Sequence, residues 1–350
     1  MEDGYSCFLG KPNLIHADIG RLLEYYKNNA IRGVCLKSPF PKTAPTPTIH
    51  ELEIESSQVK LLDKIGEGNF GDVHKGLLNG FDVAVKTLRT KTGTNENVEN
   101  PKEMLRKEAD KMRRLFHPNL CLLICVALDS EPALMILEYM NKGSLEDCVK
   151  NDEFVRQEIN LNFVLLCLKE IACGMKYLSQ QNPPIVHRDL RAANVLVHDE
   201  NKHLDFKITD FGLTEILHGR SNSFKQTEEI VLPICWLPPE ALIDKTYSVK
   251  SDVWAFGVLA FEVFTLGTNP GVFLGPDIKG NIKSGKTLTF ENCIQGLRSV
   301  KGFDRELCPE NLFDEIKTCW KLKPEQRPTF SALHESLVDY DTHDKAGQYS

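Results

Sequence analysis

The chain has 350 residues, of which 41% are hydrophobic and 26% charged, and its formal net charge is −7. This composition is that of an ordinary globular protein, and the acidic balance gives no electrostatic support for nucleic-acid binding. The longest apolar run, residues 120–128, is far shorter than the roughly 20 residues that cross a bilayer, so no transmembrane segment is expected. Eleven scattered cysteines without a C-x-x-C pair, together with no signal-peptide pattern after Met1, predict reduced thiols and a cytoplasmic location.

Residues 1–42 have the pattern of a small folded segment. A helix with one apolar face is predicted over residues 17–26, and a strand over residues 33–36. This order resembles the second half of an SH2 domain. In that family the arginine that recognises phosphotyrosine lies in the first half, so phosphotyrosine-peptide binding is not expected here. Residues 43–58 follow as a proline-rich linker.

A glycine-rich loop comes next, between two apolar, alternating segments that predict a β-hairpin. It reads Ile65, Gly66, Glu67, Gly68, Asn69, Phe70, Gly71, Asp72 and Val73. Glycine allows the backbone to lie close to phosphate oxygens, where a Cβ atom would collide. A G-x-G-x-x-G pattern alone is a weak signal, because glycines also serve plain turns.

The segment after this loop predicts a strand and then a helix. Asn79-Gly80 is a two-residue hairpin turn signal, and the short apolar strand that follows contains Ala84 and ends in Lys86. A strand-end lysine is usually solvated, but after a glycine-rich loop it is expected to hold nucleotide phosphates. Pro101 favours the start of a helix over residues 102–116, which carries Glu103 and Glu108.

The most informative stretch is residues 187–194, His-Arg-Asp-Leu-Arg-Ala-Ala-Asn. Phosphoryl transfer needs a group that accepts the proton of the attacking hydroxyl, oxygen ligands for Mg²⁺, and positive charge near the transferred phosphate. Asp189, Asn194 and Arg191 supply one of each. Further motifs follow in order: Asp210-Phe211-Gly212, Pro238-Pro239-Glu240, Asp252 in a Ser-Asp-Val-Trp segment, and Arg327 before a proline.

The ordered set resembles the protein kinases, whose catalytic loop reads H-R-D-x-x-x-x-N. The resemblance implies an α+β, bilobal protein kinase fold, preceded by the partial SH2-like segment 1–42. Its expected parts are a kinase domain over 59–340, with a β-rich N-lobe at 59–137, a hinge at 138–140 and a helical C-lobe at 141–340, and then a tail at 341–350. Residues 90–100 and 285–307 are expected to be surface insertions.

By resemblance, the cofactor is ATP with Mg²⁺, Mn²⁺ being the alternative ion. Asp189 accepts the hydroxyl proton, and Arg191 supplies charge near the γ-phosphate. Glu108 fixes Lys86, with Glu103 as the competing glutamate. Asn194 and Asp210 are the expected metal ligands. The expected nucleotide contacts are Ile65, Gly66, Glu67, Gly68, Asn69, Phe70, Gly71, Val73, Ala84, Lys86 and, at the hinge, Glu138 and Met140, with Leu137 as gatekeeper. Glu240 is expected to pair with Arg327, and Asp252 to brace the catalytic loop.

The ending Arg191-Ala192-Ala193-Asn194 resembles cytoplasmic tyrosine kinases, since serine/threonine kinases usually place lysine at the first of these positions. With the SH2-like segment and the Gly68–Gly71 loop, the chain is most similar to the Fes/Fer group of non-receptor tyrosine kinases. The expected partners are therefore proteins that carry the substrate tyrosine. A pseudokinase scaffold is the alternative, opposed by the presence of Lys86, Asp189 and Asp210. A serine/threonine kinase is the other alternative.

The segment between Asp210 and Glu240 departs from the family pattern. It contains no tyrosine, Cys235 stands where tyrosine kinases usually carry a base, and Glu215 stands where they usually carry arginine. In related kinases a phosphotyrosine here neutralises charge around the catalytic-loop arginine, Arg188. Three alternatives could take the place of this phosphotyrosine. Arg188 could make only local hydrogen bonds while Phe224 packs to hold the loop, or Glu228 or Glu229 could offer a fixed negative charge. The third alternative is phosphorylation of Ser221, Ser223 or Thr227.

Overall fold

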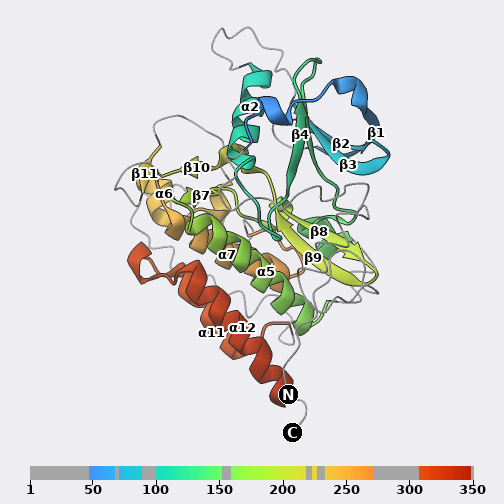
Figure 1. Cartoon of the computed structure of the whole chain (residues 1–350). Coiled ribbons are helices and arrows are strands. Elements are labelled where there is room, and N and C mark those ends of the chain that lie inside the picture. Colours follow the sequence, from blue (N-terminus) through green and yellow to red (C-terminus); the bar gives the residue numbers. More distant parts are fainter. Residues whose placement is uncertain are drawn as a thin grey trace, which may run out of the picture.

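The computed structural model describes residues 47–67, 71–88, 100–151, 159–217, 223–226, 233–270 and 307–347. These residues form a lobe rich in strands and a larger helical lobe (Figure 1), which is the bilobal kinase fold that was predicted. Several predictions lie outside the described residues: the SH2-like segment, the tip of the glycine-rich loop at 68–70, and nearly all of the two surface insertions.

The N-lobe is built on an antiparallel sheet with the strand order β1-β2-β3-β5-β4. Its strands are β1 Val59–Glu67, β2 Gly71–Leu78, β3 Phe81–Leu88, β4 Leu123–Ala127 and β5 Leu134–Glu138. The predicted hairpin turn between β2 and β3 is confirmed, with φ of 52° at Asn79 and 84° at Gly80. Positive φ at both central residues is what a type I′ turn requires, and asparagine and glycine tolerate it best. The local sequence of the turn therefore sets the register of the β2–β3 hairpin, in which Lys86 lies opposite Val73.

Helix α2, Pro101–Met112, packs against this sheet. It begins where predicted: the side chain of Asn100 accepts a hydrogen bond from the Lys102 N–H at 2.9 Å, and Pro101 occupies the first turn. A capping side chain satisfies an N–H group that has no partner within the helix. The buried face of the helix contains Glu108, so its period turns one carboxylate inward.

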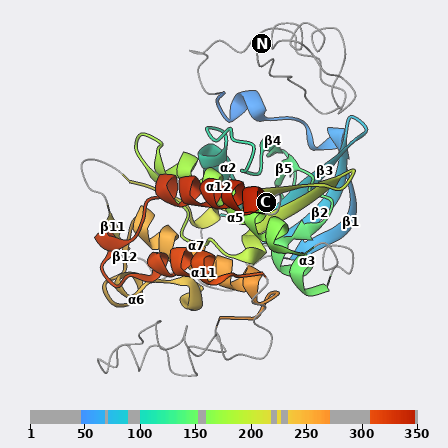
Figure 2. The same ribbon diagram turned by 90° about the horizontal axis from the view of Figure 1, so that it is seen from below.

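The C-lobe is helical around one central helix, α7, whose residues are all buried from Ser251 to Phe264. Its other helices within the described ranges are α3 Leu145–Asn151, α5 Leu161–Ser179, α6 Pro239–Asp244, α11 Glu310–Lys317 and α12 Phe330–Gly347. On α5, Leu165, Leu168, Ala172 and Met175 are buried and form an apolar stripe at helical spacing. Figure 2 shows α12 lying along α5, and α12 continues through most of the predicted tail.

Short strands hold the loops of the C-lobe in place. They are β6 Gly143–Ser144, β7 Ile185–Val186, β8 Val195–Glu200, β9 His203–Ile208, β10 Glu215–Ile216, β11 Phe224–Lys225 and β12 Thr246–Tyr247. The β8–β9 hairpin brings two predicted metal ligands close together, because Asn194 directly precedes β8 and Asp210 follows β9. Among the described residues, no helix combines the length and apolar character needed to cross a membrane.

The described part of the predicted proline-rich linker, residues 47–58, packs on the N-lobe. It contains two short 3₁₀ turns, η1 His50–Leu52 and η2 Ser56–Gln58. Ile49 is buried, and the Ile54 N–H donates to the carbonyl of Val126 in β4 at 2.8 Å. An extended, solvated linker would leave this isoleucine in water, so hydrophobic burial favours the packed arrangement. Residues 47–58 are therefore part of the N-lobe surface.

Candidate active site

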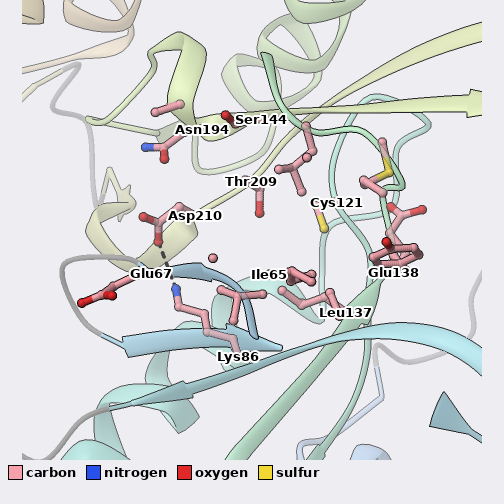
Figure 3. Close-up of a pocket in the computed structure, with 18 of the residues that line it drawn as sticks. Ile65, Glu67, Lys86, Cys121, Leu137, Glu138, Ser144, Asn194, Thr209 and Asp210 are labelled. Atoms are coloured by element: carbon pink, nitrogen blue, oxygen red, sulfur yellow. Dashed lines mark hydrogen bonds and ion pairs between the residues drawn. The ribbon is translucent and has the colours of Figure 1, made fainter. Parts of the chain in front are cut away.

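A cavity of about 420 Å³ lies between the two lobes. Its walls come from β1, β2, β3, α2 and the β5 hinge on one side, and from the catalytic loop and the end of β9 on the other (Figure 3). The predicted site residues that line it are Ile65, Gly66, Glu67, Gly71, Val73, Ala84, Lys86, Glu108, Glu138, Met140, Arg191, Asn194 and Asp210. Residues 68–70 lie outside the described residues, and Asp189 is buried just behind the wall.

Lys86 on β3 holds two carboxylates inside this cavity. Its Nζ atom lies 2.8 Å and 3.0 Å from the two oxygens of Glu108, and 3.1 Å from Oδ1 of Asp210. Burial alone would favour the neutral amine, but the two carboxylates outweigh it and raise the pKa of Lys86. The predicted pairing with Glu108 is confirmed, whereas the competing Glu103 is exposed on the same helix. A fixed ammonium therefore faces the cavity.

Asp189 lies in the catalytic loop, where its side chain is only 5% exposed. The Nε–H of Arg191 donates to its Oδ1 at 3.0 Å, and the amide of Asn194 donates to its backbone carbonyl at 2.8 Å. Burial raises the pKa of Asp189 to about 6, and the neighbouring Arg191 opposes this rise. A carboxylate with this pKa is ionised at neutral pH and more basic than an exposed aspartate, as a proton acceptor should be.

Two acids of the central helix α7 hold the backbone of this loop. The carboxylate of Asp252 accepts hydrogen bonds from the N–H groups of His187 at 2.7 Å and Arg188 at 2.9 Å. This confirms the predicted bracing of the catalytic loop. Arg188 has φ of 72°, a region that side chains with a Cβ disfavour. The two bonds to Asp252 compensate for the strain and fix the residue directly before Asp189.

Glu262 is the second of these acids, and its contact with the catalytic loop was not predicted from the sequence. Its Oε2 atom accepts the Ala192 N–H and the indole N–H of Trp236, each at 2.9 Å. Burial raises the pKa of Glu262 to about 7. The available signal was an acid inside the apolar run from Val253 to Phe264, because a buried carboxylate must find hydrogen-bond donors.

The backbone also departs from ordinary geometry at Asp210, whose φ is 62°. The preceding residue, Thr209, is held on both sides: its N–H donates to the Asn194 carbonyl, and its own carbonyl accepts from Nε2 of His187 at 3.1 Å. Burial lowers the pKa of His187 to about 4, so this ring is neutral and donates through Nε2. The turn thereby points the Asp210 carboxylate towards Lys86 (Figure 3).

Asn194 and Asp210 fit a magnesium ion by their donor chemistry. One offers a carboxamide oxygen, the other a carboxylate, and both line the same cavity. The amide nitrogen of Asn194 is bound to the Asp189 carbonyl, which orients the side chain. Mg²⁺ prefers such hard oxygen ligands and takes its remaining ligands from phosphates and water. These two residues would hold the ion at the end of the cavity that contains Lys86, the residue expected to bind nucleotide phosphates.

The hinge follows directly from β5. Leu137, Glu138 and Met140 all line the cavity, and Leu137, the expected gatekeeper, is buried. The Glu138 carboxylate is engaged elsewhere, since it accepts the Leu122 N–H at 2.7 Å and pairs with Lys207 at 2.6 Å. Because the carboxylate is occupied, a contact between Glu138 and a ligand in the cavity would have to come from the Glu138 backbone. The ion pair to Lys207 was not predicted.

The predicted ion pair between Glu240 and Arg327 is also confirmed. Both oxygens of Glu240 accept from the guanidinium, at 2.6 Å and 2.9 Å, and the arginine side chain is fully buried. A bidentate pair of this kind fixes both partners in one geometry. It ties the end of the activation segment to the last part of the C-lobe, before α12.

Residues 59–337 match the family model for protein tyrosine and serine/threonine kinases. The chain therefore belongs to this protein kinase family, in agreement with its fold and the geometry of its cavity. A curated relative is the tyrosine-protein kinase FRK of Homo sapiens, which is 35% identical to the chain over 311 residues. The match covers 87% of this chain and 56% of the relative, so the chain spans just over half the length of that protein.

Proposed function

We propose that the chain is a protein-tyrosine kinase, which transfers the γ-phosphoryl group of ATP to tyrosine hydroxyls of protein substrates. The observation that carries the proposal is one cavity lined by the Lys86–Glu108–Asp210 cluster and by Arg191, whose ion-pair partner Asp189 is buried beside it. One half of this arrangement suits a polyphosphate, and the other suits a hydroxyl that must lose its proton.

In the proposed reaction, the tyrosine oxygen attacks the γ-phosphorus in line with the leaving ADP oxygen. Its proton passes to the Asp189 carboxylate as the new P–O bond forms and the old one breaks. Lys86 holds the phosphates, and Arg191 places positive charge beside the reacting groups. When bound, Mg²⁺, or Mn²⁺ as the alternative, neutralises phosphate charge; Asn194 and Asp210 are its proposed ligands.

The preference for tyrosine is supported by two observations. Arg191 occupies the position where serine/threonine kinases usually carry lysine, and its guanidinium lies 5.8 Å from the ring centroid of Trp236, near the end of the activation segment. The FRK protein, as its name states, is a tyrosine kinase. A serine/threonine kinase remains the second candidate, because the family model includes both classes.

The test uses the purified chain with Mg-ATP and a pool of random peptides. Phosphoamino-acid analysis of the products should find phosphotyrosine, which separates the two kinase classes. Nucleotide binding without any phosphorylated product would favour the pseudokinase scaffold instead.

The proposal includes a reducing, cytoplasmic location. All eight cysteines that the structure describes are free thiols, which agrees with such a compartment. Fluorescence microscopy of the tagged chain tests this location. Phosphotyrosine-peptide binding by residues 1–42 remains unexpected, and a peptide titration with and without those residues would check it.

A further inference from the structure

The side chain of Arg188 points away from the cavity, towards the activation segment, and is almost completely buried at 4% exposure. A buried guanidinium is costly unless it finds acceptors or aromatic faces. In this chain no phosphotyrosine can serve as its partner, because residues 211–239 contain no tyrosine.

Four side chains from three separate segments surround this guanidinium. Nη2 of Arg188 donates to Oε1 of Gln226, and Nη1 lies 3.8 Å from the carboxylate of Glu215. Its central carbon lies 5.1 Å from the ring centroid of Phe224 and 4.9 Å from that of Tyr247. We call these residues, with Arg188, the Arg188 cluster. The packing of Phe224 that the sequence analysis considered is confirmed here.

The backbones of these partners are anchored independently. Glu215 pairs with Val186 in the β10–β7 ladder, one residue before the catalytic loop. Phe224 pairs with Tyr247 in the β11–β12 ladder, and their rings stack with centroids 5.5 Å apart. The Gln226 N–H donates to the Lys245 carbonyl at 2.9 Å. Figure 1 shows β7, β10 and β11 together on the same side of the molecule.

We propose that the Arg188 cluster replaces the activation-segment phosphate: an amide oxygen, a carboxylate and two aromatic rings hold Arg188 without any modification. Arg188 adopts a strained backbone conformation next to Asp189, so its side-chain partners help to position the proton acceptor. Gln226, Phe224, Tyr247 and Glu215 are therefore positioning residues, and they act through Arg188. This inference rests on the proposed kinase function and adds how that activity is maintained.

The second feature of the Arg188 cluster is the acidic side chain of Glu215. By the family pattern an arginine would occupy this position, and it would add a second positive charge near Arg188. In this chain an acid occupies the position and attracts Arg188 instead. The neighbouring Thr214 carbonyl also accepts from Lys111 of α2 at 2.5 Å, which joins the same strand to the helix that carries Glu108. Glu215 therefore supplies an unmodified negative charge beside Arg188, although Nε of Arg188 has no hydrogen-bond partner among the described residues.

The experiment compares Gln226→Leu with Gln226→Glu and with Lys225→Gln, a substitution at the exposed neighbouring residue that ends β11. The full chain is treated with phosphatase, and mass spectrometry verifies that residues 211–240 carry no phosphate. Wild type should be active in this state. Gln226→Leu should lose kcat by about tenfold, the loss expected for a hydrogen bond to a charged group. The KM for ATP should stay within about twofold, because the nucleotide contacts are untouched.

Two further comparisons distinguish a positioning role of Gln226 from a merely structural one: rescue of kcat by Gln226→Glu, and the effect of Gln226→Leu in an Arg188→Leu background. Gln226→Glu keeps an acceptor of the same length, so it should recover kcat. In an Arg188→Leu background, Gln226→Leu should cause no further loss, because the interaction is already absent. Additive losses, or a Gln226→Leu variant that behaves like Lys225→Gln, would overturn the proposal. So would a phosphatase-treated wild type that regains at least tenfold activity on phosphorylation within 211–240.

Hydrogen–deuterium exchange gives a readout that needs no catalysis. The amides of residues 223–226 should be protected in the unmodified wild type and in Lys225→Gln, and less protected in Gln226→Leu. If this pattern appears but no phosphotyrosine is formed, the proposed function fails and the Arg188 cluster stands. If phosphotyrosine is formed but protection is equal in all variants, the cluster fails and the proposed function stands.

Discussion

Glu262 and Trp236 are joined by a 2.9 Å hydrogen bond between a buried carboxylate and an indole N–H. The same oxygen, Oε2, also accepts the Ala192 N–H. One atom of the central helix thus connects the catalytic loop to the last part of the activation segment. A carboxamide has one oxygen that can accept both bonds, so this relationship survives without the charge.

We therefore expect Glu262→Gln to change how stability depends on pH. The pKa of Glu262 in the folded protein, about 7, is above the 4.5 of an exposed glutamate, so between these pH values the folded protein keeps a proton that the unfolded chain has released. Between those values this group makes the free energy of unfolding decrease as pH rises, and above them its contribution is constant. Relative to wild type, Glu262→Gln should gain roughly 1–3 kcal/mol between about pH 5 and about pH 8.

Urea unfolding at several pH values measures this difference. Burial also raises the pKa of Asp252 to about 7, so wild type keeps part of the slope, and only the difference between the two proteins reports on Glu262. A variant whose stability runs parallel to wild type over the whole range would contradict the prediction.

Asp189→Asn should separate chemistry from nucleotide binding. The carboxamide cannot take the hydroxyl proton, so kcat should fall by about 10²–10⁴-fold, as for a lost general base. Thermal stabilisation by Mg-ATP should persist, because Asp189 lies behind the cavity wall. Asp63→Asn, at an exposed position on β1, is the control and should leave kcat unchanged. Full activity in Asp189→Asn would refute its role as the proton acceptor.

Glu108→Gln should weaken the use of ATP. Lys86 keeps Asp210 but loses a full charge and one of its hydrogen bonds, so its ammonium is less firmly placed. We expect kcat/KM for ATP to fall by about tenfold or more, which corresponds to about 1.4 kcal/mol. Glu103→Gln on the exposed side of α2 is the matched control. Equal effects of the two substitutions would show that the Lys86 pair has no special role.

Gly257→Ala should destabilise the C-lobe. A Cβ atom at Gly257 would lie 2.6 Å from Nε1 of Trp320 and 2.9 Å from Cβ of Cys319, which is too close for either neighbour. Overpacking of this kind costs about 1–3 kcal/mol or more, and the melting temperature should fall accordingly. Gly66→Ala, where the nearest atom is 3.7 Å away in Val73, should leave the melting temperature unchanged.

The sequence by itself determined the elements whose signals are local. The Asn79-Gly80 turn, the helix start at Pro101 and the buried stripe of α5 depend on neighbouring residues, so short patterns predict them. The motif order identified the kinase class and the residues that face the cavity. Helix periodicity also explains why Glu108, rather than Glu103, points towards Lys86.

Only the tertiary structure decided which distant groups meet. Glu262 lies 70 residues from Ala192, and Gln226 lies 38 residues from Arg188, so no local pattern reveals either contact. Likewise, burial of Ile49 showed that part of a proline-rich linker packs on the N-lobe. Buried charges must find partners wherever the fold supplies them. The sequence shows that such groups are present, and the packing of separate segments determines their partners.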